Sequence, residues 1–130
     1  MREEARFWVD DATWDLECAQ DMLDRERYNY AVWLSRQAAE KLLKACYLIV
    51  LRSSVPRDHN LLVLGRECFG HAISEINPQL TFLNPHYTTT RYVDAALGAP
   101  KDIYDRGFAE QALTKAREVF QWIRSKVSLD

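Results

Sequence analysis

The stretch YNYAVWLSRQAAEKLLKACYLIV, residues 28–50, decides the fold class of this chain. Apolar side chains recur in it at steps of three and four residues, the spacing that brings them onto one face of an α-helix. That face consists of Ala31, Leu34, Ala38, Leu42, Ala45 and Ile49. The stretch therefore predicts a helix from about Tyr28 to Leu51, longer than the average helix of a globular protein.

Three charged residues, Glu40, Lys41 and Lys44, lie inside this apolar run. Glu40 is four residues from both Arg36 and Lys44, a spacing at which opposite charges on a helix attract by about 0.2–0.5 kcal/mol per pair. The simplest interpretation is a solvated polar stripe beside the apolar face. The alternative is that the charges belong to a binding site.

The rest of the chain is also helical in pattern. Residues 3–24 carry an apolar stripe and connect through a short polar segment to residue 28, so the two helices should pack as an antiparallel hairpin. Further helices are expected at 59–69, with Asp58 as N-cap, at about 72–83, and at about 103–127. Residues 84–102 contain threonines, a glycine and two prolines, which predicts a long loop.

Together these elements predict an all-α fold, an up-down antiparallel bundle of four long helices plus a short fifth helix. A length of 130 residues is typical of a single domain, here 1–130. No apolar run reaches the roughly 20 residues of a membrane span, and the N-terminus lacks the apolar core of a signal peptide, so we expect a cytoplasmic protein without membrane contact.

Composition argues against several functional classes. The net charge of −2 hides an acidic segment, 1–26, with nine acids and three arginines, and a basic segment, 36–71, with six Lys/Arg and three acids. Tight non-specific DNA binding is therefore not expected. Cys18, Cys46 and Cys68 form no CxxC pair and are expected to be reduced. No metal-ligand spacing or Gly-rich phosphate loop is present in the sequence, so we expect neither a metal nor a cofactor.

Several stretches, taken in order, resemble the HEPN domain family, small prokaryotic helical proteins found alone or beside minimal nucleotidyltransferases. In 28–50 the likeness rests on Tyr30, Gln37, Ala38, Ala39, Glu40, Lys41 and Lys44. VPRDHNLLVL, 55–64, matches the family at Pro56 and His59, and HYTTTRYVDA, 86–95, matches it at Tyr87, Arg91 and Tyr92. The final helix, 108–127, is similar as well. One departure is Val93, which stands where the family usually has a proline.

The resemblance implies a helix-hairpin bundle, a homodimer, and a role in handling nucleotides or RNA. It further implies a minimal nucleotidyltransferase as partner, with this chain as the possible toxin of a toxin-antitoxin pair. Two alternatives stay open. One is a non-catalytic dimeric interaction module, and the other is a metal-independent ribonuclease that acts alone.

Members of the wider superfamily cut RNA with an arginine and a histidine that have four to six residues between them. The histidine can move the proton of the 2′-hydroxyl, and the arginine can stabilise charge on the phosphate oxygens. Two windows have this spacing, which gives the catalytic candidates Arg66, His71, Arg52 and His59. Such matches also arise by chance in a chain with twelve arginines.

For a bound nucleotide or RNA phosphate, the expected contacts are Lys44, His59, Arg91 and Tyr92. An arginine beside an aromatic ring can hold a phosphate and stack on a base. It can equally anchor the loop to the bundle. The tryptophans lie at helical positions, where a place in the core or in a dimer interface is the expected role for Trp8, Trp14, Trp33 and Trp122.

Overall fold

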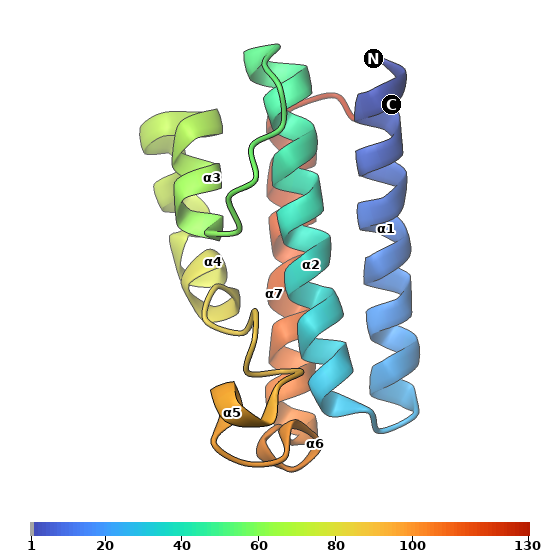
Figure 1. Cartoon of the computed structure of the whole chain (residues 1–130). Coiled ribbons are helices and arrows are strands. Elements are labelled where there is room, and N and C mark those ends of the chain that lie inside the picture. The colour runs from blue at the N-terminus through green and yellow to red at the C-terminus, as the bar shows by residue number, and fades with distance from the viewer. Residues whose placement is uncertain (1) are drawn as a thin grey trace.

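The computed structural model describes residues 2–130, which form an antiparallel helical bundle without β-strands in that range (Figure 1). Three long helices make its body, namely α1 (Glu3–Asp24), α2 (Tyr28–Cys46) and α7 (Arg106–Lys126). Shorter elements complete it: η1 (Tyr47–Leu51, a π-helical turn), α3 (Leu61–Phe69), η2 (Gly70–Ile76, a 3₁₀ helix), α4 (Asn77–Leu83), α5 (Val93–Ala96) and α6 (Pro100–Ile103). The predicted all-α antiparallel bundle is confirmed.

Helix α2 lies at the centre of the bundle, with α1 on one side, α7 behind it, and α3 and α4 on the other side (Figure 1). Its predicted apolar face is buried, with Ala31, Ala38, Leu42 and Ala45 fully inaccessible. Small alanines on α1 and α7 face the same core, which lets the three long helices approach one another closely. The start of α1 and the C-terminal end of the chain lie near each other at one end of the bundle (Figure 1), where Arg6 donates to the Leu129 carbonyl at 3.4 Å.

The end of α2 differs from a regular helix. The predicted helix does continue to Leu51, but its last turn is π-helical, and Arg52 after it has a left-handed φ of 53°. The Ser53 amide donates to the Tyr47 carbonyl at 3.0 Å, which closes this wider turn. Wide turns of this kind occur often at functional sites, and here the chain leaves the helix into the loop 52–60.

The start of α3 corrects one prediction. Asn60, not Asp58, is the N-cap, because its side-chain oxygen accepts from the amides of Leu62 and Val63 at 3.0 and 3.2 Å. Asp58 accepts from the Asn60 amide at 2.9 Å and so stabilises the turn before the helix. The predicted loop 84–102 contains two one-turn helices, α5 and α6, at the bottom of the bundle in Figure 1.

Within residues 2–130, no helix is both long enough and apolar enough to cross a membrane.

Candidate functional site

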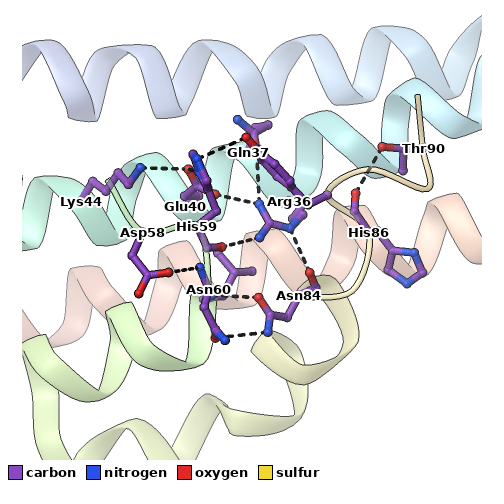
Figure 2. Close-up of polar contacts among 12 residues, drawn as sticks. Arg36, Gln37, Glu40, Lys44, Asp58, His59, Asn60, Asn84, His86 and Thr90 are labelled. Carbon is purple, nitrogen blue, oxygen red and sulfur yellow. Dashed lines mark hydrogen bonds and ion pairs between the residues drawn. The ribbon is translucent and has the colours of Figure 1, made fainter. Parts of the chain in front are cut away.

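A buried carboxylate at the middle of α2 joins three donor side chains (Figure 2). Glu40 is 3% exposed. It accepts from Arg36 Nη1 at 2.7 Å and from Lys44 Nζ at 3.1 Å, both one helical turn away, and its contact with His59 Nδ1 is 2.9 Å long. Arg36, Glu40 and Lys44 share one face of α2, whereas His59 comes from the loop 52–60. We call these four residues the Glu40 cluster.

The cluster keeps Glu40 ionised despite its burial. Removal from water alone would raise the pKa of the Glu40 carboxyl, but hydrogen bonds from His59, Arg36 and Lys44 outweigh that effect and hold the pKa below its ordinary value. The expectation of a solvated stripe is therefore wrong for Glu40 and Lys44, which are both buried. The i,i+4 pairs that this interpretation included are present.

Lys41, the third charged residue of the run, belongs to a different contact. It is half-buried, and its ammonium lies 2.6 Å from Asp11 and 2.7 Å from Asp15 on α1. Burial lowers the pKa of Lys41, but its hydrogen bonds with the two aspartates outweigh this, so that the pKa is raised. Lys41 therefore ties α2 to α1.

Arg36 connects α2 to two distant segments. Arg36 is 1% exposed, and its guanidinium donates through Nε to the Asn84 carbonyl at 3.1 Å and through Nη2 to the His59 carbonyl. The side chain of Asn84 in turn bonds Asn60 and the amide of Leu61, at 3.2 and 2.8 Å. Figure 2 shows these contacts side by side. The network positions the loop 52–60 against α2 and the end of α4.

Tyr87 connects the Glu40 cluster to the loop before α5. Its ring stacks on the His59 ring with centroids 4.5 Å apart, and its hydroxyl is 3.3 Å from His59 Nε2. The Arg36 and Arg91 guanidiniums lie 4.8 and 5.0 Å from the centroid of the same ring. Arg91 also donates two hydrogen bonds to the Tyr87 carbonyl and lies 5.0 Å from the ring centroid of Tyr92.

The buried charges of the Glu40 cluster do not balance. Arg36 and Lys44 each carry one positive charge and Glu40 carries one negative charge, which leaves a net charge of +1 before any protonation of His59. An uncompensated buried charge is unfavourable unless a counter-charge approaches it. Lys44 and His59 line an open pocket of about 540 Å³ together with Glu4, Trp8, Ser54, Val55, Pro56 and Arg57. An anion that enters this pocket can supply the missing charge.

The structure brings the predicted nucleotide contacts into one region. Lys44 and His59 share the carboxylate of Glu40, and Arg91 reaches them through Tyr87. Tyr92 stacks against Arg91 and is 51% exposed. Whether these residues bind a nucleotide stays a prediction.

The predicted catalytic pairs are arranged less favourably. Arg66 and His71 are both exposed, and the break at Gly70, where φ is 59°, separates their helices. Arg52 is exposed at the end of η1. Of these four candidates, His59 is the member of the Glu40 cluster; its side chain is 47% exposed.

Sequence reasoning paired Arg36 with Glu40 but did not name it as a site residue, and it assigned Trp8 to the core or a dimer interface rather than to this pocket. A signal for Arg36 was available, because Ser35, Ala38 and Ala39 beside it are too small and too weakly polar for a solvated helix face. Trp8 could not be assigned, since its position at the pocket depends on how α1 packs against α2. Within residues 2–130 no group of three or more His, Cys, Asp or Glu side chains is arranged to hold a metal ion.

Comparisons with known proteins agree with this architecture. The chain is 25% identical over 132 aligned positions to the protein named "Putative toxin MJ1304" of Methanocaldococcus jannaschii, an alignment that covers 92% of this chain and 86% of that protein. The crystal structure of TT1696 from Thermus thermophilus superposes with a TM-score of 0.84 at 29% identity, over 97% of this chain and 100% of the other.

A second solved structure, that of ST0689, is described as an archaeal HEPN homologue. It superposes with a TM-score of 0.78 at 28% identity, over 97% of this chain and 98% of the other. The sequence model of the HEPN domain matches residues 5–126, which is nearly the whole chain. The helical hairpin around α2, the loops that converge on it and these similarities lead to one conclusion: this chain belongs to the HEPN domain family.

Proposed function

We propose that the protein binds a phosphate group of a nucleotide or of RNA in the pocket beside Lys44 and His59. The observation that carries this proposal is the net charge of +1 in the buried Glu40 cluster, which opens onto that pocket. Lys44 supplies a point charge, and the His59 ring forms part of the pocket wall. Exposed Arg57 lines the same pocket and adds a second cationic donor.

A phosphate suits this pocket better than an apolar ligand. Burying an apolar molecule against Lys44 would remove the remaining water from a charge that Glu40 only partly compensates, whereas a phosphate would replace that water with negative oxygens. Tyr87, which stacks on His59, also contacts Arg91, and Arg91 in turn contacts Tyr92. In this proposal Arg91 and Tyr92 contact the next part of a longer ligand, such as the following nucleotide of an RNA strand.

The biological role that fits such a site is that of the toxin in a toxin-antitoxin pair, with a minimal nucleotidyltransferase as partner. The support is membership of the HEPN family and the likeness to a protein that is named a toxin. A homodimer is part of the same proposal, since large apolar side chains such as Phe7 and Trp14 are more than 60% exposed.

Binding and stability together test the phosphate site. Lys44→Met removes the surplus positive charge and keeps most of the side-chain volume, so Glu40 remains paired with Arg36. We expect at least a tenfold loss in affinity for a nucleotide monophosphate by calorimetry, with a melting temperature equal to or above that of the wild type. Lys101→Met, at a cation that is 76% exposed and outside the pocket, is the matched control and should leave affinity unchanged.

Two results would contradict the proposal. If wild-type protein binds neither nucleotides nor short RNA, the phosphate site fails and the non-catalytic interaction module is the better description. The same holds if Lys44→Met and Lys101→Met bind the ligand with equal affinity.

A second function is favoured by the geometry of His59. Its Nδ1 faces the Glu40 carboxylate at 2.9 Å, an arrangement that holds the proton on Nδ1 and makes Nε2 the acceptor. Nε2 lies 3.3 Å from the Tyr87 hydroxyl, which a substrate hydroxyl would have to displace. A histidine held in this way is suited to take the proton of a 2′-hydroxyl, with Lys44 and Arg57 beside the phosphate. The test is cleavage of single-stranded RNA by the wild type and by His59→Asn, with His71→Asn as control. Equal cleavage by wild type and His59→Asn would exclude this role.

A further inference from the structure

Part of the lining of the pocket beside Lys44 has no role in the proposed phosphate contact. Glu4 and Trp8 of α1 line it, and because they are four residues apart they lie on the same face of that helix. The indole of Trp8 is half-buried, and the Lys44 ammonium is 6.0 Å from its ring centroid. The aromatic ring of Trp8 therefore lies beside the cation that we assign to phosphate, and Glu4 lines the same pocket.

We infer that Trp8 stacks on the base of the bound nucleotide and that Glu4 selects guanine, which makes the ligand a guanosine phosphate. This inference rests on the proposed phosphate site and names what that site prefers. Lys44 and Arg57 contact the phosphate, Trp8 contacts the face of the base, and Glu4 contacts its edge. The pocket volume of about 540 Å³ lies within the range of roughly 300–1,000 Å³ that is usual for small-molecule sites.

Trp8 provides the contact that any base would share. Stacking of a base on an aromatic side chain contributes about 1–3 kcal/mol, and it does not distinguish strongly between bases. Val55 and Pro56 from the loop 52–60 line the same pocket and add apolar surface for the base. The Glu40 cluster holds this loop in place through the bond from Arg36 to the His59 carbonyl, so the pocket is formed before a ligand enters.

Glu4 provides the contact that distinguishes bases. An ionised carboxylate only accepts hydrogen bonds. Guanine presents two adjacent donors, N1–H and the 2-amino group, which match the two oxygens of one carboxylate. Adenine and cytosine place a ring-nitrogen acceptor beside their amino group, and uracil has one N–H between two carbonyls. Each of these three would set an acceptor close to the carboxylate, so guanine is favoured.

Three ligands separate the contributions of phosphate, base and base identity. Wild-type protein is titrated with ribose 5-phosphate, AMP and GMP, and binding is measured by calorimetry and by quenching of tryptophan fluorescence. We expect GMP to bind more tightly than AMP, and AMP to bind about 5- to 150-fold more tightly than ribose 5-phosphate, the factor that 1–3 kcal/mol of stacking produces.

Matched variants assign these differences to residues. Trp8→Leu should bring both nucleotides to within about threefold of ribose 5-phosphate, whereas Trp14→Leu, at a tryptophan outside the pocket, should change nothing. Trp8→Phe keeps an aromatic face and should retain part of the gain in affinity of the nucleotides over ribose 5-phosphate. Glu4→Gln should abolish the preference for GMP over AMP, and Glu3→Gln, one residue earlier and outside the pocket lining, should preserve it.

The outcomes distinguish this inference from the function on which it rests. If ribose 5-phosphate binds but GMP and AMP bind no more tightly, the phosphate site stands and the base contact is overturned. If Trp8→Leu binds both nucleotides with the affinity of the wild type, the role of Trp8 is overturned. If Glu4→Gln still prefers GMP over AMP to the same degree, the role of Glu4 is overturned. If none of the three ligands binds, the proposed phosphate site itself fails.

Discussion

Substitution of Glu40 by glutamine tests whether the buried charges of α2 stabilise the protein as a unit. Glutamine keeps the shape of the side chain but removes the negative charge, so Arg36 and Lys44 remain buried without a counter-charge. Removing one partner of a buried ion pair typically costs about 3–5 kcal/mol. For a domain of this size we expect the melting temperature to fall by about 10 °C or more.

The matched control is Glu110→Gln, which breaks an exposed pair with the same i,i+4 spacing. Glu110 lies 3.4 Å from Arg106, and the two side chains are 53% and 47% exposed. Exposed pairs contribute only about 0–1 kcal/mol. Urea unfolding of both variants gives the comparison, and a loss in Glu40→Gln of less than about 1 kcal/mol would refute the argument, since it would mean that water solvates the cluster.

The change in stability caused by a second substitution, added to Glu40→Gln, provides a stricter test. If Glu40→Gln leaves uncompensated positive charge, adding Lys44→Met to it should recover part of the lost stability, because one buried cation disappears. If Glu40 and Lys44 did not interact, the effects of the two substitutions on the free energy of unfolding would simply add. A double variant that is less stable than Glu40→Gln contradicts the charge-imbalance argument even where the single variant is strongly destabilised.

Dependence on pH follows from the same contacts. The folded state lowers the pKa of Glu40 below its ordinary value of 4.5, so the folded state holds this proton less tightly than the unfolded chain does. The stabilisation is therefore fully present above about pH 4.5 and is lost as the pH falls through the lowered pKa of the folded state. Glu40→Gln should flatten the acid limb of the stability profile, whereas Glu110→Gln should leave its shape unchanged.

Four further outcomes are expected. Asn60→Ala should cost about 1–2 kcal/mol in urea unfolding, since it removes the N-cap of α3 and a bond to Asn84, and a larger loss in Asp58→Ala would reverse our assignment of the cap. Gly65→Ala should destabilise by about 1–3 kcal/mol, because its new methyl group would lie 2.8 Å from Ile73; wild-type stability would show that Ile73 moves aside freely. Sedimentation at micromolar concentration should show a dimer, and a clean monomer would contradict the proposed homodimer. Any RNA cleavage through His59 should survive EDTA, since a ring nitrogen and cationic side chains supply that chemistry; loss of cleavage that a divalent ion restores would oppose it.

The helices were predictable from the sequence because their signal is local. The three- and four-residue spacing in 28–50 and in 108–127 places apolar side chains on one face whatever the partner is, and those faces are buried as expected. The π-helical end of α2 was not predictable, since no proline or glycine marks it within Tyr47–Leu51. The cap of α3 was misplaced because Asp58 and Asn60 are both good caps, and tertiary contacts decide between them.

The sequence could predict which charged side chains of α2 meet in the candidate site, but it could not predict that they are buried. The i,i+4 spacing showed that Glu40 could meet Arg36 and Lys44. Burial of all three depends on contacts from far along the chain, since Arg36 bonds the carbonyls of His59 and Asn84, which are 23 and 48 residues away. No periodic pattern encodes such contacts. The solvated stripe and the buried cluster therefore looked alike in the sequence.

The bonds from Arg36 to two distant loops have a consequence for the order of folding. The α1–α2 hairpin needs only neighbouring residues and can form early, whereas the Arg36 contacts cannot form until loop 52–60 and the end of α4 have both arrived. Interactions that are absent from the transition state slow unfolding without changing the folding rate. We therefore expect Arg36 to lengthen the lifetime of the folded molecule without changing its folding rate, which the hairpin would set.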